Sequence, residues 1–401
     1  MNTAARWARV NLFADAKDTA ITIVTGAFLA VAAFRLVRFV LSTGRWEIVR
    51  VNLALYLYGR YPRDELWRIV VTLVLVAFVG GVIAGIISRR RNAAALLSGD
   101  PVDHRGLGAR LRDLVVRVWP LLALVAGLLT LTRTWGPTLV TLGVLVAVAA
   151  GRAVGPFWPR RLDVVFFVLP LVLPFVLLPF LTGPLGWDKW GGIMLTLLLA
   201  SVSMIACFPL GLLLALGRRS ATLPAIRTVS VGFIEFFRGV PLVVLVLMSD
   251  QALGFFFPQD LLPGAVVRAI VVFTIFTAAY VAEIVRGGLQ SVPRGQPEAA
   301  QALGMSPWRV TGWIVLPQAL RNVIPALVGQ FISLFKDTTL VFVIGFLDPL
   351  TVSRTVTTQT DFDATYFAEA LIVAALLFWV GSYTMSRESQ RLERRLGVGT
   401  R

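Results

Sequence analysis

Long apolar runs with few charges recur along this chain, and they constrain its fold more than any other feature. A helix needs about 20 apolar residues to cross the hydrocarbon core of a membrane. Of the 401 residues, 57% are hydrophobic and only 15% are charged, which is typical of membrane proteins. The sequence therefore predicts an all-α membrane protein with about ten transmembrane helices. The runs lie near residues 19–41, 67–88, 115–132, 137–155, 162–182, 191–216, 227–249, 264–285, 322–346 and 366–386.

The distribution of positive charge indicates how these helices are oriented. A net charge of +16 could suggest a nucleic-acid partner. However, the arginines and lysines lie in short loops between apolar runs, and not in one basic domain. About two thirds of them fall on the side of the N-terminus, and such an excess is typical of cytoplasmic loops. We therefore expect both termini and the loop at 286–321 in the cytoplasm, and no nucleic-acid partner.

The sequence offers few residues for catalysis or for a metal. Its one cysteine, Cys207, lies in an apolar run, and its one histidine, His104, has no Cys or His companion for a metal site. A phosphate-binding loop ends in Lys followed by Ser or Thr. Each of the three lysines is instead followed by Asp or Trp. We expect no catalytic residue, metal or cofactor in this chain, and nucleotide hydrolysis on a separate subunit.

A polar segment at 293–317 interrupts the apolar pattern and predicts a small helix-turn-helix. Pro297 suits the first turn of a helix, because its missing N–H costs nothing there. Glu298 beside it favours the positive end of the helix dipole. Gly304 adopts the left-handed conformation that ends helices. We therefore predict a short helix over residues 297–304.

A second helix is expected directly after the first. Ser306 and Pro307 form a helix start signal, and Pro317 is expected to end that helix. Before the segment, Gly287 and Gly288 are expected to end the preceding apolar helix. Such a compact polar unit between membrane helices indicates a contact with something outside the bilayer.

The same segment resembles the EAA loop of permease subunits of ATP-binding-cassette (ABC) importers. The full pattern is present: Glu298, Ala299 and Ala300, three residues, Gly304, nine residues, Ile314, one residue, then Leu316 and Pro317. The flanking segments resemble the polar amino-acid uptake branch of that family, namely 235–241, 280–283, 286–288, 316–319 and 336–340. The resemblance covers roughly residues 190–390. The first part of the chain resembles, more loosely, the long permeases of general L-amino-acid or glutamate/glutamine/aspartate/asparagine systems.

This resemblance implies a type I importer core of five helices and a set of partners. The ATPase-coupling residues would be Glu298, Ala299, Ala300, Leu303 and Gly304. The partners would be a second, similar permease, an ATPase dimer that binds ATP and Mg, and a periplasmic amino-acid-binding protein. The implied role is import of polar L-amino acids across the bacterial inner membrane. Membrane lipid would surround the apolar helices.

Charged residues at membrane depth are candidates for the substrate pathway. Charges inside a span are costly and usually face a cavity or a partner. Arg238 precedes Gly239 and Pro241, which should interrupt the helix, and interrupted helices often form transporter binding sites. The other candidates are Glu283, Lys336, Asp337 and Thr338.

Two interpretations of these charges stay open. In the first, they neutralise one another and fix helix packing, with Glu235 paired to Arg238 and Lys336 paired to Asp337 or Glu283. In the second, Arg238 or Lys336 meets the α-carboxylate of the substrate, and Asp337 or Glu283 meets its ammonium group.

The chain divides near residue 185, in a turn-rich and aromatic segment. We predict an N-terminal membrane region at 1–185, a permease core at 186–390 with a coupling loop at 289–321, and a cytoplasmic tail at 391–401. The N-terminal region carries no recognised motif. Aromatic residues at 42–66, among them Tyr56 and Tyr61, predict anchoring at the membrane interface, or else a periplasmic contact surface.

A self-contained secondary transporter or channel is the alternative function. It would need an ion pathway within this chain, for which Glu283 and Asp337 are the main candidates. It would also leave the helix-turn-helix without a role. A membrane enzyme would need a polar catalytic cluster, which we do not find in the sequence.

Overall fold

A computed structural model describes residues 3–98, 112–113, 115–116, 118–132, 135–183, 186, 189–220, 222–256, 258, 261–360, 362 and 364–397. Over these residues the chain is helical, and strand pairing is limited to one bridge between Gly191 and Leu347. His104 lies outside the described residues. The predicted all-α fold is confirmed.

Every predicted apolar run coincides with a helix or with a bent pair of helices. Within the described residues, seven helical stretches are long and apolar enough to cross a membrane, or eight if the bent pair counts as one span. The predicted count of about ten also included α6, whose apolar part is shorter, and α8. The helices at the ten predicted runs are α2 (Ala16–Arg38), α4 (Leu66–Ser98), α6 (Trp119–Thr132), α7 (Gly136–Val154), α8 (Asp163–Thr182), α9 (Gly192–Arg218), the pair α10 (Pro224–Gly239) and α11 (Leu242–Gln251), α13 (Ala265–Ser291), α16 (Leu316–Asp337) and α18 (Phe367–Leu396).

Shorter elements connect these helices. In the first half of the chain they are α1 (Thr3–Asn11), η1 (Phe39–Thr43), α3 (Glu47–Tyr58), η2 (Arg63–Glu65), η3 (Gly155–Phe157) and η4 (Arg160–Leu162). In the second half they are α12 (Leu253–Phe256), α14 (Gly295–Ala302), α15 (Pro307–Arg309), the π-helical η7 (Val310–Val315), the 3-10 helix η8 (Thr338–Ile344), α17 (Pro349–Val356) and η9 (Ala364–Tyr366).

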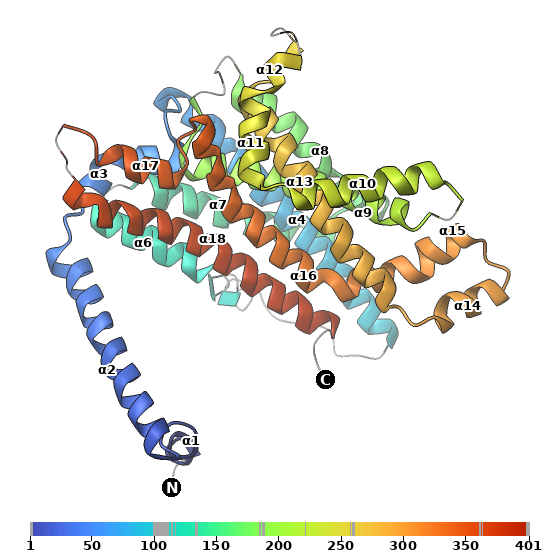
Figure 1. Ribbon diagram of the computed structural model, residues 1–401, viewed down its shortest axis with the longest axis horizontal. Helices are drawn as coiled ribbons and strands as arrows, with labels where there is room; N and C mark the ends of the chain where they lie inside the picture. Colours follow the sequence, from blue (N-terminus) through green and yellow to red (C-terminus); the bar gives the residue numbers. More distant parts are fainter. Residues whose placement is uncertain are drawn as a thin grey trace.

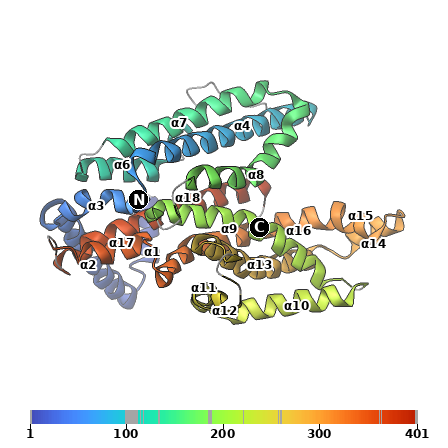
Figure 2. The ribbon, with the colours of Figure 1, turned by 90° about the horizontal axis from the view of Figure 1, so that it is seen from above.

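The helices form layers, with the N-terminal region along one side of the core. Helices α4 and α7 lie on one side and α10 and α11 on the opposite side, with α8, α9 and α13 between them (Figure 2). Helix α13 is central, because 56% of its most apolar stretch is buried, against 0% for α2. Helix α2 stands apart from the other helices (Figure 1).

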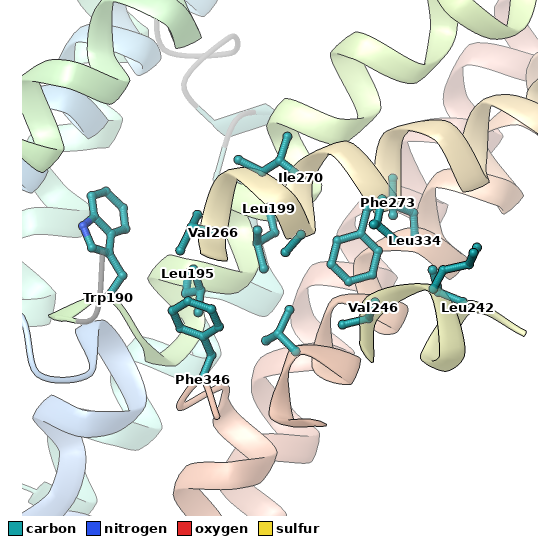
Figure 3. Packing of buried hydrophobic residues seen from close by; sticks show 14 of the residues in the cluster. Trp190, Leu195, Leu199, Leu242, Val246, Val266, Ile270, Phe273, Leu334 and Phe346 are labelled. Atoms are coloured by element: carbon teal, nitrogen blue, oxygen red, sulfur yellow. The ribbon is translucent and has the colours of Figure 1, made fainter. Parts of the chain in front are cut away.

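The core is packed around α9 and α13. Buried side chains from both helices and from α11 and α16 form one cluster, including Leu195, Leu199, Phe273 and Leu334 (Figure 3). Further along α13, Gly288 allows close approach to α16, because a Cβ there would lie 2.4 Å from Cγ1 of Val323. The prediction that α13 ends at this glycine is wrong. The helix continues to Ser291, and the small residue serves helix packing instead.

Two pairs of glycines hold the N-terminal region together. Gly81 and Gly85 on α4 face Gly151 on α7 and Gly155 at the start of η3, and the two glycines of each pair are four residues apart. A Cβ at Gly151 would lie 2.2 Å from the carbonyl oxygen of Phe78. This small-xxx-small spacing lets two membrane helices approach backbone to backbone. Helices α4 and α7 are therefore a tightly packed pair.

An ion cluster fixes one end of the same unit. The Arg89 guanidinium donates two hydrogen bonds to the Asp163 carboxylate, at 2.6 and 2.7 Å. Arg90 contacts the same carboxylate at 3.0 Å. Asp163 begins α8, where a negative charge also suits the helix dipole. The cluster therefore ties the end of α4 to the start of α8.

Helix α3 joins the N-terminal region to the core. Its side chains pack on α17 and α18 in one buried cluster. The Tyr56 hydroxyl donates to the carbonyl oxygen of Ala370 at 3.1 Å, and burial raises the pKa of Tyr56 to about 12. Asn52 and Gln359 exchange two amide hydrogen bonds. Because Tyr56 and Tyr61 are buried, the prediction that they anchor the chain at the membrane interface is wrong.

Three chain segments meet backbone to backbone beside α3. A Cβ at Gly59 would lie 2.4 Å from Cα of Gly191. The amide of Gly192 donates to the carbonyl oxygen of Leu347 at 2.6 Å. Gly59 and Gly192 both have positive φ, at 66° and 57°, which favours glycine there. The end of α3, the start of α9 and the segment before α17 therefore converge at one junction.

Candidate coupling surface and substrate pathway

The second core span is broken, as the sequence predicts. Helices α10 and α11 meet at an angle of 100°. Val240 between them is extended, with φ −94° and ψ 132°, because the ring of Pro241 disfavours the helical conformation of the preceding residue. Arg238 lies in the last turn of α10, directly before the break.

An ion cluster lies beside this break and joins three helices. Glu283 on α13 contacts Arg286 at 2.5 Å, Arg218 at 3.3 Å and Arg238 at 3.9 Å. Arg218, at the end of α9, also contacts Glu235 of α10 at 3.1 Å. Three arginines thus surround two carboxylates. The cluster links the ends of α9 and α10 to α13 and keeps one net positive charge.

This arrangement bears on both interpretations of the charges, mutual ion pairing and contact with the substrate. Both oxygens of the Glu283 carboxylate face arginines, with Arg286 at Oε1 and with Arg218 and Arg238 at Oε2. For Glu283 this fits the ion-pair interpretation. The expected pairs are wrong in detail, since Glu235 contacts Arg218 and not Arg238. Arg218 was not predicted as a site residue, because its partner lies 65 residues away in sequence.

Arg238 is the member of the cluster that keeps donors for a further partner. Its guanidinium carbon lies 5.8 Å from the centre of the Tyr280 ring, a cation–π distance. Its single ion-pair contact is long, and 34% of its side chain is exposed. The ring and Glu283 hold the guanidinium in place without using up its N–H groups.

The remaining predicted pathway residues lie where α16 passes into η8. Lys336 is exposed, Asp337 is half-buried and Thr338 is fully buried. The Thr338 hydroxyl donates to the carbonyl oxygen of Phe335 at 2.7 Å, so it supports the backbone of its own helix. Lys336 and Asp337 therefore stay candidates for substrate contact, and Thr338 is better explained as a packing residue.

A buried carboxylate, that of Asp348, supports η8. Asp348 caps the start of α17 by accepting from the amides of Leu350 and Thr351, both at 3.0 Å. It also accepts a hydrogen bond from the Thr339 hydroxyl of η8. The signal was present in the sequence, since Asp followed by Pro is a helix start. Asp348 thus ties η8 to the start of α17.

The coupling loop contains the two predicted helices, with shifted ends. Helix α14 covers residues 295–302 where 297–304 was predicted, and Gly304 has the expected positive φ, 78°. Glu298, Ala299 and Leu303 are exposed, whereas Ala300 is 3% exposed and packs in the cluster with Val310 and Val315. Ala300 therefore holds α14 against η7 and does not lie on the outer surface.

The second helix does not end at Pro317, so that prediction is wrong. The chain stays helical from Pro307 through η7 into α16, and Pro317 lies in the first turn of α16. The amide of Leu316 donates to the carbonyl of Thr311, five residues earlier. This wider π-helical turn accommodates the proline at a place where an ordinary helix interior would be interrupted.

The sequence of this chain matches those of known proteins. The family of binding-protein-dependent transport system inner membrane components matches residues 207–398. The permease BztC of the glutamate/glutamine/aspartate/asparagine transport system of Rhodobacter capsulatus is 36% identical over 363 residues, covering 88% of this chain and 78% of BztC. The chain belongs to this family.

Other relatives cover a smaller part of this permease. The inner membrane amino-acid ABC transporter permease YhdY of Escherichia coli is 46% identical over 214 residues, which cover 53% of this chain and 57% of YhdY. A crystal structure of an amino acid ABC transporter with histidines covers 50% of this chain and 90% of that chain, at 35% identity and a TM-score of 0.44.

The match with BztC extends into the N-terminal region of this permease. A match over 363 residues is longer than the part of the chain after residue 185, so it includes residues before that point. The family match, by contrast, begins within α9. Among the described residues no group of three or more His, Cys, Asp or Glu could hold a metal ion.

Proposed function

We propose that this chain is the membrane subunit of an ATP-driven, binding-protein-dependent importer of polar L-amino acids. The substrates would be glutamate, glutamine, aspartate and asparagine, or a wider range of L-amino acids. The names of the relatives support this class, since BztC and YhdY are both amino-acid permeases.

One observation carries the proposal: charges at the broken span lie on the outside of the subunit. The side chain of Glu235 is 55% exposed and that of Arg238 is 34% exposed, and Lys336 is exposed as well. Charges at membrane depth do not face lipid without a large cost in free energy. The surface that carries them therefore needs a second protein or a water-filled pathway against it. A second, similar permease would supply both.

In this assembly Arg238 would meet the α-carboxylate of the substrate. Its guanidinium is oriented by Tyr280 and Glu283 and keeps free donors, and a guanidinium suits a carboxylate. Asp337 would meet the ammonium group, because both Glu283 oxygens already face arginines. Both groups would act only on binding, and no bond of the substrate would be broken.

The energy would come from an ATPase dimer that binds ATP and Mg on its own subunits, with no cofactor on this chain. Residues Glu298, Ala299, Leu303 and Gly304 of the coupling loop would contact the ATPase, with Ala300 holding α14 in place from behind. A short helix packed rigidly on its neighbours can pass a movement of the ATPase to α16 and α13. A periplasmic binding protein would deliver substrate at the opposite end.

The proposed orientation follows from this coupling. The coupling loop and both termini, including the tail at 391–401, would lie in the cytoplasm of a bacterial cell, with α17 at the periplasmic end. The excess of arginines on the side of the N-terminus supports the same orientation.

Reconstitution tests the proposal. The chain, a second permease, the ATPase and the binding protein would be placed in lipid vesicles, and uptake of each amino acid would be measured with and without ATP. We expect uptake that needs ATP and every component. Uptake by vesicles that contain this chain alone would overturn the proposal and would indicate the secondary transporter or channel.

A further inference from the structure

The turn that joins α7 to α8 combines exposed arginines with exposed apolar side chains. Arg160 and Arg161 of η4 are both exposed. Phe157, which ends η3, is 88% exposed, and Leu162 is 45% exposed. Apolar side chains that stand among charges in this way indicate a surface that contacts both polar and apolar groups. We call residues 157–162 the basic turn.

The basic turn lies at the depth where hydrocarbon gives way to lipid headgroups. Beside it, α4 carries no charge from Ile69 to Ile87, which is roughly 28 Å of helix. A hydrocarbon core is about 30 Å thick, so Arg89 and the residues after it lie at its edge. The apolar part of α8 starts at Val164, directly after the turn. Figure 2 shows the passage from α7 to α8 at one edge of the molecule.

Contacts with α4 hold the backbone of the turn in place. Nη1 of Arg89 donates to the carbonyl oxygen of Pro156 at 3.4 Å and to that of Trp158. Gly155 lies directly against α4, because a Cβ there would lie 2.9 Å from Cα of Gly85. The shape of the turn is thus fixed by its backbone. Its exposed side chains are therefore available for a ligand.

The surroundings of the basic turn keep a surplus of positive charge. Residues 89–91 and 155–163 contain five arginines and one acidic residue, Asp163. That carboxylate is already engaged by Arg89 and Arg90. Within the described residues, Arg160 and Arg161 form no ion pair. Two neighbouring guanidinium groups without a carboxylate attract a phosphate, whose oxygens accept their paired N–H donors.

The opposite end of α4 has nearly balanced charge. Residues 60–68 contain three arginines and two acidic residues. Glu65 pairs with Arg68 at 2.6 Å, and Asp64 follows Arg63 directly. Arg60 and Arg63 are nevertheless as exposed to the surroundings as the arginines of the basic turn. The two ends of one helix therefore provide a site and a matched control.

We propose that the basic turn binds the headgroup of an anionic phospholipid. In this site Arg160 and Arg161 contact the phosphate, and Phe157 and Leu162 lie against the start of the acyl chains. Basic clusters beside membrane helices are typical binding sites for anionic headgroups. A soluble anion would match the two arginines but would leave both apolar side chains in water. Because the site contacts neither substrate nor ATPase, it is independent of the proposed transport function.

Lipid binding to the purified full chain tests the proposal. Native mass spectrometry in detergent would measure the affinity for phosphatidylglycerol, which is anionic, and for phosphatidylcholine with the same acyl chains, which has no net charge. We expect the natural chain to prefer phosphatidylglycerol. R160Q/R161Q should bind it at least about fivefold more weakly, because each arginine near the headgroups adds to the attraction. R60Q/R63Q removes the same charge at the other end of α4 and should keep the natural affinity.

Three results of this measurement would overturn the proposal. The first is a natural chain that binds both lipids equally. The second is an equal loss of affinity in the two double variants, which would show an effect of net charge alone. The third is displacement of the lipid by glycerol phosphate at the same concentration, which would make the ligand a soluble anion. Thermal unfolding of both variants should match that of the natural chain, since all four arginines are exposed.

Photo-crosslinking examines the site with both arginines intact. Benzoyl-phenylalanine would replace Phe157, with Trp135 at the opposite end of α7, 67% exposed, as the control position. The full chain would be placed in vesicles of phosphatidylglycerol and phosphatidylcholine in equal amounts. We expect crosslinks from 157 to phosphatidylglycerol in several-fold excess, and no such excess from 135. Equal crosslinking of the two lipids at 157, or crosslinks from 157 to a second copy of the chain, would contradict the proposal.

Discussion

The N-terminal region and the permease core both use glycine for close helix packing, but they use charge in different ways. In the N-terminal region, glycines pack α4 against α7 backbone to backbone, and the buried carboxylate Asp163 joins two helix ends. In the core, a span is broken at Val240, and an ion cluster with surplus positive charge lies beside the break. Irregular backbone and exposed charge at membrane depth mark functional sites. From this comparison we expect the N-terminal region to act as a scaffold beside the core.

The largest effect is expected from the glycine packing of the scaffold. Gly151→Ala places a Cβ 2.2 Å from the Phe78 carbonyl oxygen, whereas Gly143 on the same helix has nothing within 4 Å. Because backbone cannot move aside easily, Gly151→Ala should lower the free energy of unfolding by about 2–3 kcal/mol. Thermal unfolding in detergent measures this, with Gly143→Ala as the control. Equal stability of the two variants would show that α4 and α7 are not closely packed.

A smaller effect is expected from the equivalent change in the core. A Cβ at Gly288 would meet the side chain of Val323 at 2.4 Å and a backbone oxygen at 2.8 Å, and Gly287 is open. A valine side chain can rotate, so Gly288→Ala should cost about 1–2 kcal/mol, less than Gly151→Ala. Thermal unfolding of Gly287→Ala provides the control. A cost larger than that of Gly151→Ala would reverse the comparison between the regions.

Charge removal should separate transport from stability. Arg238→Ala should lower ATP-dependent uptake at least tenfold, which corresponds to about 1.4 kcal/mol, with little change in stability because its ion pair is long. Arg90→Ala, at an exposed arginine of the N-terminal cluster, should leave uptake per folded molecule unchanged. Uptake assays normalised to protein in the vesicles decide this. Normal transport by Arg238→Ala would remove this residue from the substrate pathway.

The smallest effect is expected at the junction of the two regions. Tyr56→Phe removes the hydrogen bond to the Ala370 carbonyl and should cost about 1 kcal/mol. The folded pKa of Tyr56 is raised to about 12 from 10.0, so its contribution is complete below pH 10 and is lost as the pH rises toward 12. The free energy of unfolding, measured from pH 9 to 12, should therefore fall less steeply with pH for Tyr56→Phe than for the natural chain. The same pH dependence of the free energy of unfolding in both proteins would contradict the burial of the Tyr56 hydroxyl.

Local signals in the sequence predicted the parts of the site that depend on neighbouring residues. The break at α10–α11 follows from Gly239 and Pro241 themselves, and the end of α14 follows from Gly304. The pairing of Gly81 with Gly151 also leaves a local signal, because each glycine begins a glycine-xxx-glycine spacing. These features need no knowledge of distant parts of the chain.

Long-range contacts could not be predicted in the same way. Arg218 and Glu283 are 65 residues apart, and either could have paired with several other charges. Tyr56 meets Ala370 across 314 residues, and an aromatic residue near a membrane end is equally typical of an interface anchor. The sequence therefore supplied the candidate residues, and tertiary packing chose their partners.

The meeting of Gly59, Gly191 and Leu347 has a mechanical consequence for any transport cycle. Since these backbones touch with no side chain between them, the corner they form cannot slide or open without breaking the hydrogen bond of Gly192. We expect rearrangements that admit or release cargo to leave this corner intact. The bend at Val240 and the π-helical turn at 310–315 are two irregular places in the core where such a movement can be absorbed.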